Sequence, residues 1–189
     1  MSATNRGAIR KESDFYATPL ETVYTFLDNY NGISESDTIL EPSAGNGNII
    51  RALRNRGYKN RIDAMVLREE ERFNLVGWAD RVGIFDFLSE DITDKYDVII
   101  GNPPYNLAQE FIEKSLTLLK PGGRLIFLLR TNFLESKKRF SFWQKNALRG
   151  LYVLSCRPSF TGKGIDATSY SWFIWEKTEA VDNQTIKVI

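Results

Sequence analysis

Short apolar runs alternate with longer amphipathic stretches along most of the chain. The apolar runs are rich in Val, Ile, Leu and Phe and have the length of buried strands, whereas the stretches between them repeat apolar residues at helical spacing. Strands are predicted within 37–45, 61–67, 81–87, 96–102, 123–129, 150–156 and 170–177. Helices are predicted over 48–58, 68–79, 106–120 and 136–148. This alternation predicts an α/β fold with a mainly parallel sheet and helices on both faces.

Two loops that follow predicted strands carry the most informative residues. In a sheet of this kind, ligands bind outside the carboxyl ends of the strands, near the point where the strand order reverses. The loop "EPSAGNG" (41–47) contains Gly45 and Gly47, which allow positive φ and a close approach of backbone to a ligand. It has no following Lys-Ser/Thr, and Glu41 would repel a phosphate, so a cationic or zwitterionic ligand fits it better. The alternative is a tight turn that needs glycine for structural reasons alone.

Composition narrows the chemistry further. The 189 residues are 42% hydrophobic and 26% charged, as expected for one globular domain. With no histidine and with Cys156 as the single cysteine, the chain cannot form a Ser/His/Asp triad, an intrachain disulfide or a cysteine-cluster metal site. No apolar run is long enough to span a bilayer, and the polar first residues do not resemble a secretory signal. We therefore expect a cytoplasmic protein with no bound metal and no membrane partner.

Positive charge is concentrated in one part of the sequence. Residues 120–163 contain ten Lys and Arg residues and one acidic residue, Glu135, whereas the rest of the chain has 15 basic and 23 acidic residues. This asymmetry is typical of a nucleic-acid-binding face on an otherwise acidic protein. The alternative is a solvated surface whose charges are balanced by acidic neighbours in the folded protein.

The motifs, taken in order, resemble those of the S-adenosylmethionine-dependent amino-methyltransferases, in particular the N6-adenine DNA methyltransferases. The motifs are "FYATP" (15–19), "EPSAGNG" (41–47), "FDF" (85–87), "NPPY" (102–105), "PGGRLIFLLRTNFL" (121–134) and "RPSF" (157–160). The resemblance implies a Rossmann-like methyltransferase fold with a seven-stranded, mainly parallel sheet and an antiparallel last strand. The motif order looks like the γ arrangement without its separate target-recognition domain. We expect one domain over 1–189, with an N-terminal cofactor-side segment (1–36), the sheet core (37–178) and a tail (179–189).

The resemblance assigns catalysis to the "NPPY" loop. In the family, the Asn side-chain oxygen and the next backbone carbonyl, here those of Asn102 and Pro103, accept the two hydrogens of the target amino group. Pro103 and Pro104 fix the angle of that carbonyl and offer no competing N–H. Tyr105 stacks on the target base, which is rotated out of the duplex. The structural alternative is a helix start with two prolines and an aromatic cap.

Further residues are expected to contact the base or the nucleic acid. Phe160 is the candidate for the second face of the flipped base, and Trp172 or Phe133 would serve geometrically. The candidates for nucleic-acid contacts are Lys137, Lys138, Arg139, Arg157 and Lys163. Lys163 belongs to a Gly-Lys-Gly sequence that could follow a phosphate backbone, although the same sequence is typical of a simple hairpin tip.

The implied cofactor is S-adenosyl-L-methionine. The residues that match the family's cofactor contacts are Tyr16, Thr18, Pro19, Glu41, Ser43, Ala44, Gly45, Gly47, Asp86, Phe87 and Asn102. Thr18-Pro19 also has the form of a capped helix start, and Asp86-Phe87 also fits a surface aspartate beside a core phenylalanine.

One position departs from the family. Its second strand usually ends in an acid that binds the ribose, but here Val66 and Leu67 are apolar and the first acid is Glu69. Either Glu69 reaches the ribose or the contact is missing.

The substrate has several possible identities under this resemblance. "NPPY" also occurs in protein-glutamine methyltransferases and in some RNA adenine methyltransferases. The "FYATP" element and the positive segment favour DNA, in a short target site or in single-stranded or distorted form, with a homodimer or a partner adding specificity. Such a small chain looks like the orphan methyltransferases of bacteriophages. A catalytically inactive DNA-binding protein is the alternative outside the enzymes, motivated by the apolar residues at 66 and 67.

Overall fold

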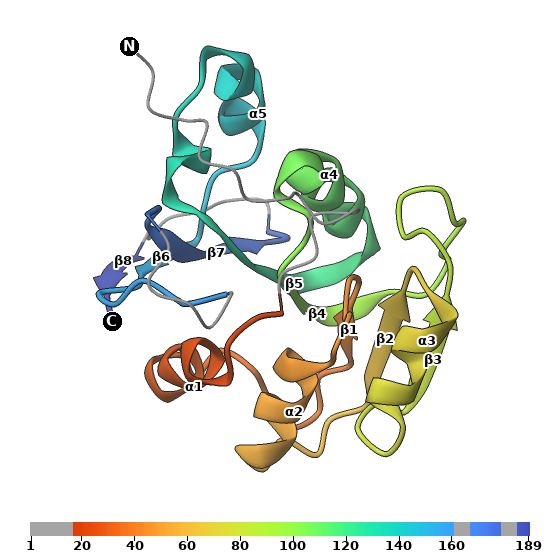
Figure 1. Ribbon diagram of the computed structural model, residues 1–189. Helices are drawn as coiled ribbons and strands as arrows, with labels where there is room; N and C mark the ends of the chain where they lie inside the picture. Colours follow the sequence, from red (N-terminus) through yellow and green to blue (C-terminus); the bar gives the residue numbers. More distant parts are fainter. Residues whose placement is uncertain (1–16, 161–166, 179–184) are drawn as a thin grey trace, which may run out of the picture.

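The fold is built around one sheet, which the computed structural model shows with helices packed against it (Figure 1). The structure describes residues 17–160, 167–178 and 185–189. The strands are β1 (Ile39–Glu41), β2 (Ile62–Val66), β3 (Arg81–Ile84), β4 (Tyr96–Gly101), β5 (Leu119–Arg130), β6 (Gly150–Val153), β7 (Tyr170–Glu176) and β8 (Thr185–Val188). The α-helices are α1 (Leu20–Asn29), α2 (Asn48–Asn55), α3 (Glu69–Arg72), α4 (Ala108–Leu118) and α5 (Phe140–Lys145). Short 3-10 turns are η2 (Phe73–Leu75), η3 (Tyr105–Leu107), η4 (Thr131–Leu134) and η5 (Lys137–Arg139).

The strand order is β3-β2-β1-β4-β5-β7-β6-β8. Neighbours from β3 to β5 pair in parallel, and β7 runs antiparallel to both β5 and β6. The predicted mainly parallel sheet with an antiparallel last strand is therefore confirmed. An additional strand, β8, pairs in parallel with β6 and lies within 179–189, which we expected to be a tail. The order reverses between β1 and β4, so the loops after these strands lie at the expected ligand edge.

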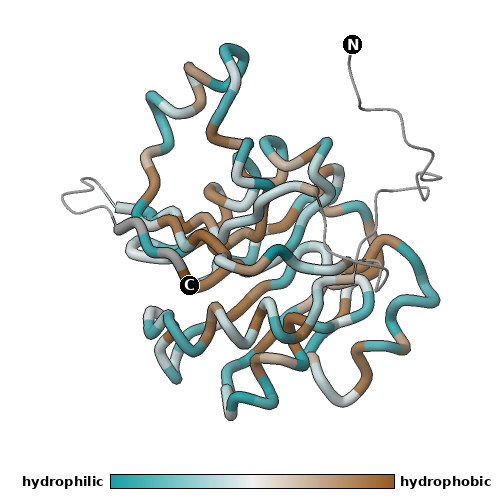
Figure 2. The backbone as a smooth tube through the Cα atoms, turned by 60° about the vertical axis from the view of Figure 1, so that its left-hand side comes forward, coloured by the Kyte–Doolittle hydropathy of each residue, from teal (hydrophilic) through white to brown (hydrophobic). Residues whose placement is uncertain are grey.

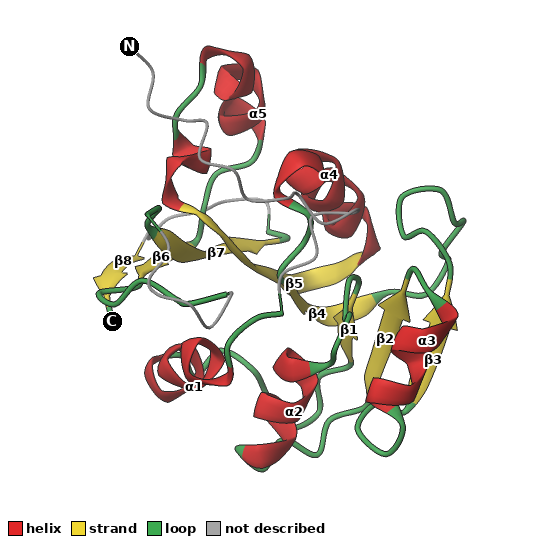
Figure 3. Ribbon diagram, viewed as in Figure 1, coloured by secondary structure: helices red, strands yellow, loops and turns green. Residues whose placement is uncertain are grey.

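Helices cover both faces of the sheet, with α1 and α2 on one face and α4 and α5 on the other (Figure 3). Successive side chains of β7 pack into the apolar layers on opposite faces of the sheet, because side chains alternate along a strand. Trp172 stacks on Phe26 of α1 with ring centroids 4.7 Å apart, whereas Phe173 meets Phe133 edge to face at 6.0 Å. The hydropathy view shows the apolar residues concentrated along the central strands (Figure 2).

Two predicted helices are shorter than the sequence indicated. Only α3 and α5 form within 68–79 and 136–148, and 3-10 turns adjoin both. The apolar side chains that suggested longer helices are largely exposed: Phe73 at 74%, Val76 at 69% and Phe140 at 66%. Gly77, with φ of 79°, ends the first of these segments. Periodicity over-predicted these helices because several of their apolar residues, unlike the buried Leu75 and Phe142, do not face the core.

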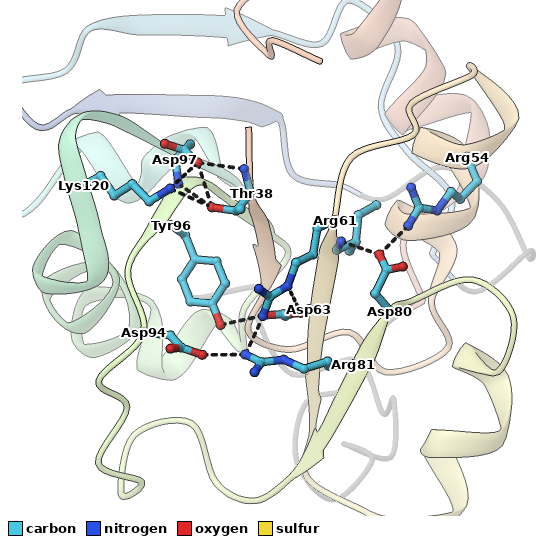
Figure 4. A network of polar contacts seen from close by, with 11 residues as sticks. Thr38, Arg54, Arg61, Asp63, Asp80, Arg81, Asp94, Tyr96, Asp97 and Lys120 are labelled. Carbon is cyan, nitrogen blue, oxygen red and sulfur yellow. Dashed lines mark hydrogen bonds and ion pairs between the residues drawn. The ribbon is translucent and has the colours of Figure 1, made fainter. Parts of the chain in front are cut away.

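Ion pairs close the amino ends of the strands, opposite the ligand edge (Figure 4). Asp63, whose side chain is 5% exposed, accepts hydrogen bonds from Arg81 (2.8 Å), Arg61 (3.1 Å) and the Tyr96 hydroxyl (3.0 Å). Burial, together with the neighbouring carboxylate of Asp63, raises the pKa of Tyr96 to about 12. These hydrogen bonds connect β2, β3 and β4 at the amino edge of the sheet.

A second group of contacts at the same edge joins β1, β4 and β5. The Asp97 carboxylate accepts from the backbone N–H of Thr38 at 2.8 Å and from Lys120 at 2.7 Å. Burial alone would raise the pKa of Asp97, but these contacts outweigh it and hold that pKa below its usual range. The Oδ2 atom of Asp97 therefore already bonds within the protein.

Candidate active site

The two informative loops meet at the carboxyl edge of the sheet. Strand β1 pairs with β4, with Leu40 opposite Ile99, so the residues that end the two strands are neighbours. Glu41 is the last residue of β1, and Asn102 directly follows the last residue of β4. The sequence motifs "EPSAGNG" and "NPPY", which are more than fifty residues apart in the chain, therefore share one site.

The first loop has a backbone that only glycine supports at two positions. Gly45 has φ of 50° and Gly47 has φ of 77°. The Ala44 N–H donates to the Met65 carbonyl at 2.9 Å and the Gly47 N–H donates to the Ala44 carbonyl at 2.7 Å, so the turn is fixed against β2. A Cβ on Gly47 would lie 2.6 Å from Leu75 Cδ2. This loop is a rigid turn whose glycines are needed for its shape.

Two buried polar atoms of this loop have no bonding partner. Glu41 is 2% exposed, and within the described residues neither its Oε2 atom nor the Ser43 hydroxyl makes a hydrogen bond. Burial raises the pKa of the Glu41 carboxyl well above its usual range, although the backbone N–H of Ile50 acts in the opposite direction. Native proteins rarely leave such atoms unsatisfied. The loop therefore offers acceptors to a ligand that brings a cationic group or N–H and O–H donors.

Thr18 joins the N-terminal segment to both loops. It is 4% exposed, and its carbonyl accepts from the Asn48 side chain at 2.7 Å while its hydroxyl accepts from Asn102 Nδ2 at 3.0 Å. The cap of α1 is Pro19, with no side-chain capping bond, so the Thr18 hydroxyl serves the site rather than the helix end. Because the amide nitrogen of Asn102 is held by Thr18, the Oδ1 atom is the acceptor that this side chain presents. Tyr16, from the same predicted motif, lies outside the described residues.

The two prolines form an extended connection between β4 and α4. Pro104 has φ of −54° and ψ of 123°, and its carbonyl accepts from the Leu107 N–H at 3.0 Å. The 3-10 turn η3 then begins at Tyr105 and leads into α4. Pro103 lies between Asn102 and this turn, so its carbonyl is held next to the Asn102 amide by two residues with restricted φ.

The Tyr105 ring is packed on by a second tyrosine and by an arginine. Its centroid lies 5.7 Å from that of Tyr170 and 5.0 Å from the Arg130 Cζ atom. Burial and then Tyr170 raise the pKa of Tyr105 well above its usual range, and Arg130 acts in the opposite direction. A base that stacks on Tyr105 would therefore take the place of one of these contacts.

The other aromatic candidates do not face Tyr105 directly. Phe160 packs on Tyr170, with ring centroids 4.9 Å apart, so the rings of Tyr105, Tyr170 and Phe160 form a row. Trp172 is fully buried and Phe133 is 7% exposed, and both belong to the core layers. Tyr170 and Arg130 were not predicted as site residues, although both lie at strand ends on the predicted ligand edge.

The "FDF" residues divide between surface and core. Asp86 is exposed, and its carboxylate accepts from the Leu88 N–H at 2.9 Å. Phe87 is 2% exposed and packs against Phe111 of α4, with ring centroids 4.9 Å apart. Asp86 therefore lies where a ligand could reach it, whereas the Phe87 ring packs in the core, and its expected cofactor contact stays a prediction.

The position of the expected ribose-binding acid is apolar in the structure as well. Val66 ends β2 and is buried, and Leu67 after it is 54% exposed. The Glu69 carboxylate lies 3.7 Å from Arg72 on its own helix, and Glu71 pairs with Arg68. The nearest carboxylates therefore already have cationic neighbours, and the end of β2 itself presents none.

The positive segment does not form one face, which corrects the expectation from sequence. Lys120 pairs with Asp97, and Arg149 and Arg124 lie 3.1 and 3.8 Å from Glu176, all at the amino edge. By contrast, a second group follows the carboxyl ends of β5 and β6 and has no carboxylate within 4.0 Å in the described part of the chain: Lys137, Lys138, Arg139 and Arg157. Lys163 lies outside the described residues. This second group, together with Arg130 at the end of β5, lies at the ligand edge, where a polyanion could reach it.

The described residues contain neither a cluster of metal ligands nor a membrane-spanning helix. No group of three or more Cys, Asp or Glu side chains there is placed to hold a metal ion. None of the described helices combines the length and apolar composition that a membrane span requires.

Curated proteins with similar sequences are methyltransferases. The Type II methyltransferase M.CvrRI of Paramecium bursaria Chlorella virus XZ-6E is 31% identical over 127 residues, which cover 56% of this chain and 33% of that protein. The Type II methyltransferase M.TthHB8I of Thermus thermophilus is 27% identical over 128 residues, covering 51% and 30%. A tRNA1(Val) (adenine(37)-N6)-methyltransferase of Flavobacterium johnsoniae is 35% identical over 78 residues, covering 36% and 33%. The matches span about a third of each relative.

Solved structures with the same fold include many methyltransferases. A protein of Listeria monocytogenes described as a class I S-adenosylmethionine-dependent methyltransferase superposes with a TM-score of 0.69 at 17% identity, over 95% of this chain and 65% of that one. The EcoKI M protein of a Type I restriction enzyme gives a TM-score of 0.65 at 16% identity, over 86% and 44%. No protein-family profile matches the chain. The predicted resemblance and the predicted fold class are confirmed.

Proposed function

We propose that this chain, which has the class I S-adenosylmethionine-dependent methyltransferase fold and is related in sequence to Type II methyltransferases, methylates the N6 amino group of adenine in DNA. The observation that carries the proposal is the Thr18–Asn102 hydrogen bond of 3.0 Å. It supports Oδ1 as the acceptor end of the Asn102 amide, beside the loop that contains the unsatisfied Glu41 oxygen.

The residues of the first loop fit S-adenosyl-L-methionine. The amino-acid part of that cofactor carries an ammonium group next to a sulfonium, and both suit a buried acidic oxygen without a partner. Glu41, Ser43 and the backbone of 44–47 would hold the amino-acid part, with Thr18 and Pro19 closing one side. When bound, the cofactor supplies an electrophilic methyl group. We propose that adenosine is held without a carboxylate on the ribose, since the end of β2 presents Val66 and Leu67.

The "NPPY" residues then act on the amino group of the target. An adenine amino nitrogen is a weak nucleophile because its lone pair is delocalised into the ring. Asn102 Oδ1 and the Pro103 carbonyl would accept its two hydrogens, which favours the tetrahedral geometry that nitrogen adopts as it attacks. The restricted φ of Pro103 and Pro104 keeps the second acceptor in place before the substrate arrives. Tyr105, with Tyr170 and Phe160 behind it, would receive the flipped base.

DNA is the substrate that we favour over RNA. The Type II relatives are matched over 127 and 128 residues, whereas the tRNA methyltransferase is matched over 78. Its 35% identity nevertheless makes adenine in RNA the second candidate. A protein glutamine amide, which presents the same planar NH2 group, comes third. We do not favour an inactive DNA-binding protein, because the hydrogen bond from the Asn102 amide nitrogen to Thr18 supports Oδ1 as the acceptor that catalysis would need.

Sequence specificity is proposed to be limited for this domain. Contacts from the described lysine and arginine side chains at the ligand edge would go to phosphates, which carry no sequence information. We therefore propose that the domain reads a short site or takes single-stranded or distorted DNA, and that a second copy or a partner protein adds specificity.

The experiment is methyl transfer from labelled cofactor to a panel of single-stranded DNA, duplex DNA, tRNA and a release-factor protein. We expect incorporation at adenine N6 in DNA. Asn102→Ala should lower the rate by about two to three orders of magnitude, as typically results from losing one preorganised transition-state hydrogen bond. Asn29→Ala, which removes an exposed amide from α1, is the matched control and should keep the wild-type rate. The proposal is wrong if the folded protein binds the cofactor but labels no DNA, or if Asn102→Ala is as active as wild type.

A further inference from the structure

A cavity of about 230 Å³ lies beside Tyr105, between the start of α4 and the carboxyl end of β5. Arg130 and Arg139 contribute two guanidinium groups to its wall, and none of the described residues that line it is acidic. Asn106 and Asn132 add two side-chain amides. A cavity with this lining attracts an anion and offers it several N–H donors.

Arg139 is already held in position. Its Nε donates to the Phe133 carbonyl at 2.8 Å, and its Nη2 donates to the carbonyls of Glu135 and Asn132 at 2.6 and 3.3 Å. Its guanidinium also lies over the Phe133 ring, with Cζ 4.5 Å from the centroid. These bonds use Nε and Nη2, so the N–H groups of Nη1 have no partner among the described residues. An arginine that is fixed in this way loses little conformational freedom when it binds a ligand.

Arg130 connects the cavity to the proposed base site. Its Cζ lies 5.0 Å from the centroid of the Tyr105 ring, and both side chains belong to the cavity wall. An anion held by Arg130 would therefore lie next to the residue that is proposed to stack on the target base. The volume is several times the roughly 30 Å³ of one water in the liquid, so a phosphate group fits.

We propose that this cavity binds one phosphodiester group of the DNA strand that carries the target adenine, with Arg130 and Arg139 as its ligands. The assignment rests on the proposed function, because a DNA substrate is what would place a phosphate beside Tyr105. It gives the two arginines a role that differs from that of Lys137 and Lys138. Those lysines are exposed on η5 and would add attraction without selecting a linkage.

The test measures binding of a short single-stranded oligonucleotide with one adenine by fluorescence anisotropy. Each phosphate is replaced in turn by a neutral methylphosphonate, and the series is repeated with Arg130→Gln and Arg139→Gln. In the wild type, one replacement near the adenine should weaken binding about tenfold, the effect of losing one charge-assisted hydrogen bond. In either variant the same replacement should have a smaller effect than in the wild type, because one arginine remains, and in the double variant it should have none. Lys145→Gln, which removes a charge from an exposed side chain outside the cavity, should keep the wild-type pattern.

The proposal is overturned if the oligonucleotide does not bind, if every linkage contributes equally, or if Lys145→Gln erases the pattern as the cavity variants do. Arg139 also donates to three backbone carbonyls, so its replacement could destabilise the fold. Thermal melting is therefore recorded for each variant, and if Arg139→Gln has a lowered melting temperature the conclusion is drawn from Arg130→Gln. Methyl transfer is measured separately. A linkage-specific pattern without methyl transfer supports the cavity and contradicts the proposed function, whereas methyl transfer without the pattern does the reverse.

Discussion

Replacing Glu41 with glutamine should affect stability and cofactor binding in opposite directions. The carboxyl group lies at the end of a central strand, is 2% exposed and has one oxygen with no partner in the described part of the chain. Glutamine has nearly the same shape and brings no charge. The variant therefore removes the ionisable group from the buried site of the ligand-free protein and, at the same time, the carboxylate acceptor proposed for the cofactor.

The size of both effects can be estimated. Glutamine still leaves one buried polar atom without a partner but cannot ionise, so Glu41→Gln should gain only the cost of the buried charge, about 1–3 kcal/mol at pH 7. For a chain of this size 1 kcal/mol shifts the melting temperature by roughly 2–4 °C, so the melting temperature should rise by about 2–12 °C. Losing a charge-assisted hydrogen bond of about 1.5–3 kcal/mol should weaken S-adenosylmethionine binding by about 10- to 150-fold.

The pH dependence gives an independent check on the cause. Burial raises the pKa of Glu41 in the folded chain. Above the unfolded glutamate pKa of about 4.3, the unfolded chain releases this proton while the folded chain keeps it until its own, higher pKa is passed. The free energy of unfolding of the wild type should therefore fall, relative to that of Glu41→Gln, as pH rises from about 4.3 through the folded pKa. Near pH 4 the two proteins should have similar stability.

Thermal melting between pH 4 and 8 and calorimetric titration with S-adenosylmethionine measure these effects. Glu71→Gln is the matched control, since Glu71 is also buried but pairs with Arg68. That variant should lose about 1 kcal/mol of stability and keep its cofactor affinity. The reasoning fails if Glu41→Gln melts below the wild type at pH 7, if the difference does not grow with pH, or if the variant binds the cofactor with unchanged affinity.

Three further variants test other contacts. Thr18→Val removes the hydroxyl that orients Asn102, and it should lower kcat for methyl transfer at least about tenfold with a smaller effect on cofactor affinity, while Thr18→Ser restores the rate. Gly47→Ala places a Cβ 2.6 Å from Leu75 Cδ2 at a positive φ, and a urea titration should show a loss of about 1–3 kcal/mol. Asp63→Asn removes the carboxylate that Arg61 and Arg81 share, although Arg81 keeps its pair with Asp94. It should lower the melting temperature through a loss of about 1–3 kcal/mol, and a changed cofactor affinity in calorimetry would contradict the separation of the two edges.

The seven predicted strands could be read from the sequence because most of them are buried on both sides. A strand such as β5 packs helices against each face, so its apolar run is nearly continuous and stands out from its surroundings. The terminal strand β8 did not stand out, because it has four residues and lies at the edge of the sheet. The helix over 68–79 was predicted too long because it was assumed that apolar residues such as Phe73 face the core. The sequence does not say which apolar side chains remain at the surface.

The site could be predicted as a set of loops but not as a set of contacts. The strand-to-helix order brings the loops of Glu41 and Asn102 to one edge. The hydrogen bond between Thr18 and Asn102 spans 84 residues and depends on how the N-terminal segment docks, which no local pattern encodes. The packing of Arg130 on Tyr105 was missed for the same reason. Local rules place residues at an edge, and long-range packing decides which of them touch.

The alternation of β7 also provides two separate optical signals. Trp172 belongs to the layer with α1, whereas Trp175 stacks 6.2 Å from Trp143 in the layer with α5. Variants that each keep a single tryptophan, either Trp172 or Trp175, would report the melting of one layer through the fluorescence of that tryptophan. Coincident curves would mark the sheet as a single cooperative unit, and separated curves would show which helical layer detaches first.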